Sequence, residues 1–159
     1  MLAYIKNGII VGLHDDYQDV DPAAYGEGVR IVPVQGTAKV RDPEPAATKP
    51  NLKAYAANKR WRLVTGGFTS GGVIFATDAQ SQASLQGAYL LAQDNPSLTV
   101  NWKGKDGTFH ELNKAAIDTA TTAIGTFIQD CFTTEAEAIA GIDSNTLTTY
   151  DQVDTFFSA

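Results

Sequence analysis

The sequence is poor in the residues on which most enzyme and metal chemistry depends. Its 159 residues include one cysteine, Cys131, and two histidines, His14 and His110. A single cysteine excludes an intrachain disulfide bond. Cys131 falls on the apolar stripe of an expected helix, where cysteine packs as a small hydrophobic residue. Neither histidine is near it in sequence to serve as a base. We therefore expect Cys131 to be a core residue and not a nucleophile.

Long apolar runs and an excess of positive charge are also missing. No run approaches the roughly 18 residues of a membrane-spanning helix, and the first eight residues lack the basic and apolar regions of a signal peptide. The formal net charge is −6, which is the wrong sign for binding phosphate backbones. The one basic cluster, Lys59-Arg60-Trp61-Arg62, fits a solvated helix end better than a nucleic-acid site. We expect no membrane insertion, no nucleic-acid partner and assembly in a cytoplasm.

The apolar residues that are present, 43% of the chain, suffice for a packed core. Their pattern predicts an α+β fold: a small N-terminal β-ribbon, a proline-rich linker, and a compact domain of two β-hairpins packed with three to four helices. We place these parts at residues 1–36, 37–50 and 51–159. Because Pro43, Pro45 and Pro50 hold the linker extended and deny it ladder hydrogen bonds, we expect deletion of residues 1–36 to leave the remaining domain folded.

The ribbon is predicted from a strong turn signal. Asn7-Gly8 separates two β-like runs, and both residues tolerate the positive φ angles of a tight hairpin turn. A third strand follows at residues 29–34, with Pro33 at an edge or end. So small a ribbon buries little alone, so we expect it to dock on the main domain or on a partner. The candidate docking residues are Tyr4, Ile5, Ile9, Ile10, Val11, Ile31, Val32 and Val34.

The main domain is predicted to alternate helices and hairpins. The expected elements are a helix at 51–60, strands at 62–65 and 72–77, a helix capped by Thr77 or Asp78 that ends at Asp94, strands at 99–103 and 108–112, a helix capped by Asn113 that ends near Ala140, and a last short helix around Tyr150. Gly141 suits the left-handed position after the long helix. The half-buried strand pattern around Trp61 and Trp102 favours core anchoring over a carbohydrate platform.

Three clusters are candidate sites of chemistry. His14, Asp15, Asp16, Asp19 and Asp21 lack the central glycine and closing glutamate of a calcium loop, which favours a solvated loop. The glycine pairs at 66–67 and 71–72 connect strand to strand, whereas a phosphate loop leads into a helix. Asp106, His110 and Glu111 match no hydrolase motif, although paired carboxylates acting on a glycan stay formally open. We expect no catalytic, cofactor-binding or metal-binding residues, and no cofactor.

Six runs of the main domain carry a resemblance to a known family. They are KRWRLVTGGF at 59–68, GVIFATD at 72–78, SQASLQGA at 81–88, NP at 95–96, VNWKGKDGTF at 100–109 and CFTTEA at 131–136. In order and spacing they resemble a helical α+β domain of unknown function found in tail and tail-fibre proteins of phages and prophages. The resemblance covers about residues 51–159.

The resemblance implies a structural component of a bacteriophage tail, present in the virion and assembled in the host cytoplasm. Its partners would be other tail proteins of the baseplate or fibre, and copies of itself in a homo-oligomer. No catalytic residues are established for the family, so none is carried over. The alternatives are a tail-fibre assembly chaperone that is not retained in the virion, a decoration protein, and a small glycan-cleaving tail enzyme.

Overall fold

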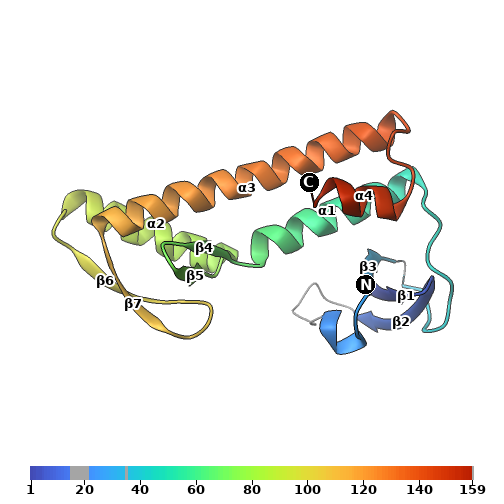
Figure 1. Ribbon diagram of the computed structural model, residues 1–159, viewed down its shortest axis with the longest axis horizontal. Helices are drawn as coiled ribbons and strands as arrows, with labels where there is room; N and C mark the ends of the chain where they lie inside the picture. The colour runs from blue at the N-terminus through green and yellow to red at the C-terminus, as the bar shows by residue number, and fades with distance from the viewer. Residues whose placement is uncertain (15–21, 35, 159) are drawn as a thin grey trace. The chain divides into compact units, whose positions relative to one another are not determined.

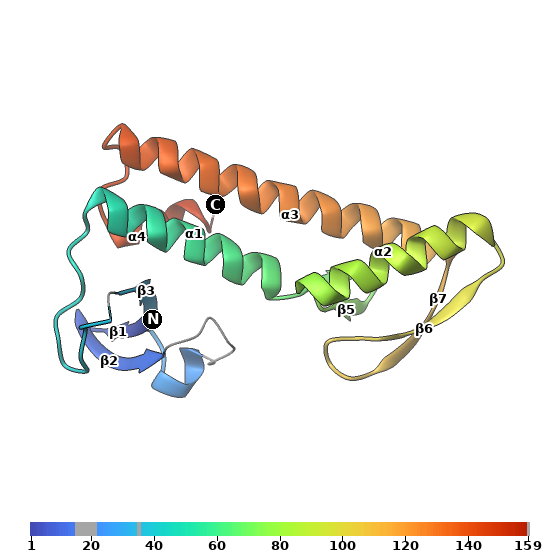
Figure 2. The same ribbon diagram turned by 180° about the vertical axis from the view of Figure 1, so that it is seen from behind.

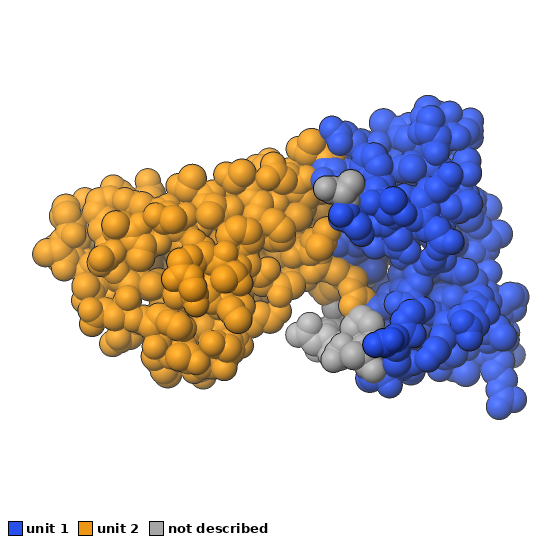
Figure 3. Space-filling view, in the orientation of Figure 1, with its two compact units in different colours: residues 1–59, 134–159 blue, residues 60–133 orange. Residues whose placement is uncertain are grey.

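The computed structural model describes residues 1–14, 22–34 and 36–158. It has the predicted α+β fold. The chain forms two compact units, coloured separately in Figure 3: residues 1–59 with 134–159 form unit 1, and residues 60–133 form unit 2. Helices α1 (Lys49–Thr65) and α3 (Lys114–Asp143) each contribute residues to both units.

The ribbon of unit 1 is a three-stranded antiparallel sheet (Figure 1). Strands β1 (Leu2–Lys6) and β2 (Ile9–His14) form the predicted hairpin, and Asn7 and Gly8 adopt the expected positive φ angles of 53° and 73°. Strand β3 (Arg30–Pro33) pairs with the other side of β1, so β1 is central. The turn and the third strand are confirmed.

The backbone nitrogen of Pro33 faces the open side of β3, away from β1. The backbone N–H of Val34 donates to Met1 O at 3.1 Å. Because successive residues of a strand point their N–H groups to opposite sides, the position of Pro33 faces away from β1. Its missing amide hydrogen therefore removes no ladder bond, which confirms the predicted edge position.

The segment predicted as a linker, residues 37–50, binds the outer edge of β2. Ile10 N–H donates to Asp42 O at 2.8 Å, Arg41 N–H donates to Ile10 O at 2.7 Å, and Glu44 N–H donates to Gly8 O at 2.9 Å. Proline was expected to deny this segment ladder bonds, but the residues on either side of Pro43 supply the donors and the acceptor. The segment is fastened to the ribbon and is not a free spacer.

One hydrophobic core joins the ribbon to the helices of unit 1. Its buried members are Ala3, Ile5, Ile10 and Val32 of the ribbon, Leu52, Tyr55 and Ala56 of α1, Ala138 and Ile142 of α3, and Tyr150 and Val153 of α4 (Tyr150–Phe156). The ribbon therefore docks on the chain's own helices, which was one of the two expected outcomes. The two compact units do not follow the predicted boundaries at residues 36 and 51.

Unit 2 has its own core beneath two hairpins. The hairpins are β4 (Phe68–Ser70) with β5 (Val73–Phe75), and β6 (Thr99–Lys103) with β7 (Phe109–Asn113); α2 (Ala79–Asp94) lies between them in sequence (Figure 2). Buried members of this core are Val73, Phe75, Leu85, Ala92, Leu112, Ile117, Ala120 and Ile124. The predicted caps are confirmed: Asp78 accepts from Ser81 N–H, and Asn113 accepts from Ala116 N–H, both at 3.0 Å.

The first hairpin of unit 2 was predicted wrongly. Residues 62–65 are the last turn of α1 and not a strand, and Val64 there is buried. The helix ends where Gly66 N–H donates to Leu63 O and Gly67 adopts a φ of 99°. The hairpin then turns at Gly71 and Gly72, whose φ angles of 56° and 81° fit a two-residue turn.

The end of α3 also differs from the prediction. The helix passes through Gly141 to Asp143, and Asn145, with a φ of 60°, takes the left-handed position after it. A Cβ atom at Gly141 would lie 3.0 Å from Leu147 Cδ1. Glycine is needed here because Leu147 packs closely against the helix, and not because the position needs a positive φ.

Candidate functional site

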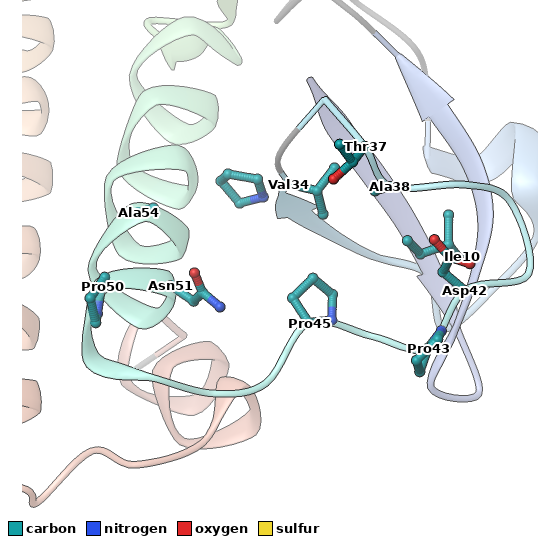
Figure 4. Close-up of a pocket in the computed structure, with 11 residues that line it drawn as sticks. Ile10, Val34, Thr37, Ala38, Asp42, Pro43, Pro45, Pro50, Asn51 and Ala54 are labelled. Atoms are coloured by element: carbon teal, nitrogen blue, oxygen red, sulfur yellow. The ribbon is translucent and has the colours of Figure 1, made fainter.

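A proline-lined groove in unit 1 is a candidate binding site. It has a volume of about 530 Å³ and lies between the ribbon, the segment 37–50 and the start of α1 (Figure 4). Its lining residues are Ile10, Pro33, Val34, Thr37, Ala38, Asp42, Pro43, Pro45, Pro50, Asn51 and Ala54. Four prolines give it stiff walls, because each fixes its own φ angle.

Two polar side chains of the groove, those of Asn51 and Asp42, form local contacts. Asn51 Nδ2 donates to Ala46 O at 2.8 Å, and Asp42 Oδ2 accepts from Lys39 N–H at 2.7 Å. Asp42 is the one ionisable residue among those that line the groove. General acid–base catalysis needs positioned proton donors and acceptors whose pKa values lie near the working pH. Asp42 is a single carboxylate that stabilises a turn, so it does not form an acid–base pair with another lining residue. The groove is suited to binding an apolar group.

A charged cluster ties together the elements around the groove. Arg30 of β3 forms ion pairs with Glu44 (3.0 Å), with Asp154 (3.2 Å) and with Asp151. Its guanidinium also lies 5.5 Å from the centre of the Tyr150 ring. One side chain thus links the ribbon, the segment 37–50 and α4, and the planar guanidinium suits several carboxylates at once.

Asp154 is the centre of the second half of this cluster. It accepts from Tyr55 Oη at 2.6 Å and from Lys59 Nζ at 2.5 Å, both on α1. Burial by itself would raise the pKa of Asp154, but these two hydrogen bonds and the positive charges of Lys59 and Arg30 together lower it. Burial and the hydrogen bond to Asp154 raise the pKa of Tyr55, and burial raises the pKa of Tyr150 to about 12. The cluster holds Asp154 as a carboxylate and both tyrosines as neutral donors.

The predicted docking residues are mostly covered by the chain itself. Ile5, Ile10 and Val32 are buried against the helices. Tyr4 and Ile31 are buried on the opposite face, where the Tyr25 ring stacks on Tyr4 at 4.6 Å. Val11 and Val34 are partly buried against these two clusters, and Val34 and Ile10 line the groove. Ile9, 47% exposed, is the one of the eight that is open to a partner.

The candidate catalytic residues of unit 2 do not all converge. Trp102 pairs with His110, and Asn101 with Glu111, so His110 and Glu111 point to opposite faces of the β6–β7 hairpin. Asp106 Oδ1 accepts from Thr108 N–H at 3.0 Å, and this bond lowers the pKa of Asp106. Glu111 thus lies across the sheet from His110, and Asp106 stabilises its own turn. Asp106 and His110 both lie beside Gly104, where a Cβ atom would be 2.6 Å from Asp106 Oδ1 and 3.4 Å from His110 Nε2.

The other residues singled out in the sequence have packing roles. Cys131 is buried; burial raises the pKa of its thiol, and Asp130 raises it further. In the basic run, Lys59 pairs with Asp154, and Arg60 lies 4.5 Å above the Phe132 ring. Trp102 packs on Phe75 with ring centres 5.7 Å apart, while Trp61 is half-buried in α1. The interpretations of Cys131 and Trp102 as core residues are confirmed.

The remaining expectations concern metals, phosphate and membranes. Asp15, Asp16, Asp19 and Asp21 lie outside the described residues. Elsewhere in the chain, no three His, Cys, Asp or Glu side chains gather as metal ligands. The pair Gly66-Gly67 follows a helix, and Gly71-Gly72 joins two strands, so neither leads into a helix N-terminus. No helix of the described part is long and apolar enough to cross a membrane.

The groove and the Arg30 cluster were not predicted from the sequence. Arg30 and its partner Asp154 are 124 residues apart, and no local pattern connects them. From the sequence, Pro43, Pro45 and Pro50 are predicted to be spacer residues and not the wall of a groove. Their position between a ribbon and the start of a helix is the signal that could indicate the rigid wall of a groove. Using it requires knowing that residues 41–44 form backbone hydrogen bonds with β2.

These features define a two-unit α+β protein with a proline-lined groove in unit 1. Residues 47–156 match the model of the family described as a domain of unknown function (DUF4376), and the chain belongs to this family. The match starts just before α1 and ends at the last residue of α4, so it excludes the ribbon. No curated protein and no solved structure matches the chain.

Proposed function

We propose that this protein is a structural component of a bacteriophage tail, an adaptor or attachment protein of the baseplate or the tail fibre that acts by protein–protein contacts. In this proposal it is part of the virion and is assembled in the host cytoplasm, with other tail proteins as partners. The six runs that resemble phage tail proteins all lie within residues 59–136, inside the matched family domain. The family description itself is silent on a role.

The observation that carries a contact function is the exposure of large apolar side chains in unit 2. Leu90, Leu91 and Phe109 are 56%, 60% and 67% exposed. Isolated exposed apolar residues are common on protein surfaces, but exposed apolar patches mark sites of contact with other proteins. The placement of His110 and Glu111 on opposite faces of the hairpin supports binding over acid–base catalysis by these two residues.

Purified phage particles test the proposal directly. A structural component is present in a fixed ratio to the other tail proteins, as measured by quantitative mass spectrometry of particles purified by density gradient. Reconstruction of the particle by cryo-electron microscopy then places it in the tail. Absence of the protein from particles that need it for assembly would instead identify the tail-fibre chaperone, and location on the head would identify a decoration protein.

The enzyme alternative has its own test. If the protein cleaves glycans of the cell envelope, single substitutions of Asp106, His110 or Glu111 should abolish release of sugar fragments from purified envelopes. The proposal expects no such release from the wild-type protein, because these side chains lie on different faces of the hairpin or cap its turn.

A further inference from the structure

Asn58 of α1 is a buried polar side chain without a partner. It is 3% exposed, and neither its Nδ2 nor its Oδ1 atom has a hydrogen-bond partner among the described residues. The other buried polar residue of the described part, Thr77, uses its hydroxyl oxygen as an acceptor. Trp102, His110 and Thr121 each have one buried atom without a partner, but these residues are partly exposed. Asn58 differs from all of them, because its whole amide is both buried and unpaired.

The fold of the chain by itself does not favour this asparagine. A buried amide that makes no hydrogen bond destabilises the folded state, and asparagine is also a weak helix former. Asn51 of the same helix differs, because its Nδ2 donates to Ala46 O at 2.8 Å. A leucine of similar size would suit position 58 better. The amide of Asn58 therefore needs a partner from outside the chain to explain it.

Asn58 continues the α1 wall of the proline-lined groove by one turn. Asn51 and Ala54 line the groove from α1 (Figure 4). At 3.6 residues per turn, position 58 lies about 20° from Asn51 and about 40° from Ala54 around the helix axis. It lies about 6 Å further along the helix than Ala54. The three residues share one face of α1, and all belong to unit 1.

The groove supplies apolar surface and few donors. Its four prolines have no backbone N–H, and its one ionisable lining residue, Asp42, is an acid. Together with the net charge of −6, this disfavours an anionic ligand. Ligand pockets of about 300–1,000 Å³ are typically apolar, with a few polar groups that fix the orientation of the ligand. The groove, at about 530 Å³, falls in this range, and Asn58 is suited to be the orienting group.

An extended peptide backbone is the chemistry that matches an unpaired side-chain amide. Asn58 offers an acceptor, Oδ1, and a donor, Nδ2, and each peptide residue offers one N–H and one C=O. One residue of a peptide can therefore satisfy both atoms. A ligand with only donors or only acceptors would leave one buried atom unpaired. A helical ligand would use its backbone groups internally, whereas an extended one leaves them available.

We propose that the proline-lined groove binds an extended apolar peptide segment of a partner protein, with the backbone of one residue hydrogen-bonded to Asn58. The inference rests on the proposed function, in which the chain acts by protein–protein contacts, and it names the surface and the chemistry of the bound segment. Apolar side chains of the segment pack on the prolines, and the amide of Asn58 fixes its register.

The stability of the free chain tests whether Asn58 lacks a partner. Asn58→Leu should raise the midpoint of thermal unfolding, measured by circular dichroism, because it removes a buried unpaired amide. The matched control Asn51→Leu removes a paired amide of the same helix and should lower the midpoint. A lower midpoint for Asn58→Leu would mean that the amide is already satisfied in the free chain, and would overturn the proposal.

Binding is tested with terminally blocked tripeptides of valine, of leucine and of phenylalanine, added at millimolar concentration to the full-length ¹⁵N-labelled protein. At least one of them should shift the nuclear magnetic resonance signals of the Asn58 side-chain amide and of the Ala54 backbone amide. Its affinity should fall about tenfold or more in Asn58→Leu, and also in Ala54→Phe, which fills the groove. Ala140→Phe changes an exposed alanine of α3 in the same unit and should bind as the wild type does.

Ester analogues of the bound tripeptide test the hydrogen bond itself. Replacing the backbone amides by esters one at a time removes a single N–H in each analogue. One of these analogues should bind the wild type more weakly than the parent peptide does, but should bind Asn58→Leu as weakly as the parent. Absence of a shift with every tripeptide, or equal affinities of the wild type and Asn58→Leu, would overturn the proposal.

These results are independent of the particle experiment. A chain whose groove binds the peptide but which is missing from particles would refute the tail role and keep the groove as a peptide site. A chain found in particles whose groove binds none of the tripeptides would do the reverse.

Discussion

At the scale of single residues, glycines within the helices serve different purposes. Gly125 of α3 is exposed, and a Cβ atom there would meet nothing within 4 Å. Gly141 of the same helix packs against Leu147, so a Cβ atom there would lie 3.0 Å from two carbons of that side chain. No packing contact requires glycine at position 125, whereas the contact with Leu147 requires glycine at position 141.

This contrast predicts opposite effects of one substitution. Gly125→Ala should raise the free energy of unfolding by about 0.5–1 kcal/mol, because alanine restricts the unfolded chain and favours the helix. Gly141→Ala should lower it by about 1–2 kcal/mol, since the new methyl group displaces Leu147. Urea denaturation followed by circular dichroism measures both. Equal effects of the two substitutions would contradict the assignment.

Asp154 gives a prediction about pH. Its pKa is lower in the folded chain than its ordinary value of about 3.9, because Lys59 and Tyr55 donate to it. Such a carboxyl contributes stability above its unfolded pKa, and this contribution disappears as the pH falls through the folded pKa. Asp154→Asn should lower the free energy of unfolding by about 1–3 kcal/mol near neutral pH, and its stability should fall less than that of the wild type below about pH 4.

The control for this prediction is Asp143, which pairs with Lys53 at the surface with its side chain 54% exposed. Exposed ion pairs contribute about 0–1 kcal/mol, so Asp143→Asn should change stability by less than that. If the stability of the wild type and of Asp154→Asn fell identically with pH, the hydrogen bonds from Lys59 and Tyr55 to Asp154 would contribute nothing to the free energy of unfolding.

At the scale of elements, the junction between the β4–β5 hairpin and α2 depends on one hydroxyl group. Thr77 is fully buried, and its Oγ1 accepts from Gly67 N–H at 2.9 Å. Thr77→Val keeps the shape but leaves that N–H without an acceptor, which should lower the free energy of unfolding by about 1–3 kcal/mol. Thr77→Ser keeps the acceptor and should lose less. Denaturation midpoints of the two variants give the comparison, and a valine variant as stable as the serine variant would refute it.

The sequence predicted elements well where a local signal determines them. The Asn7-Gly8 turn, the Asp78 cap and the Asn113 cap each rest on the chemistry of one or two residues and were confirmed. Residues 62–65 were misassigned because a short apolar run suits a strand or a buried helix turn equally. Tertiary packing around Val64 decided for the helix.

The candidate site depended on contacts between distant parts of the chain and could not be predicted in the same way. The groove exists because residues 41–44 bind β2 while α1 begins at Lys49. The cluster around Arg30 joins residues from 30 to 154. The spacing of apolar residues indicates which face of an element is buried. It does not indicate whether the chain's own helices or a partner covers that face.

At the scale of the whole molecule, the shared core of unit 1 changes what a deletion of the ribbon would mean. The sequence alone predicts that the domain stays folded without residues 1–36. In the structure, Leu52, Tyr55 and Val153 are buried together with Ile5 and Val32 of the ribbon, and Arg30 supplies three ion pairs. Loss of residues 1–36 would expose this core and leave carboxylates without their cation.

We therefore expect the deletion to unfold unit 1 selectively. Hydrogen exchange measured by mass spectrometry should lose protection in residues 49–59 and in α4, where burial depends on the ribbon. Peptides from α2 and β7 serve as an internal control, because the core of unit 2 contains no residue of the ribbon. Full protection of α4 in the deletion would contradict the shared core. A docking role of the ribbon in the tail is better tested by Ile9→Asp, which changes an exposed side chain and leaves the core intact.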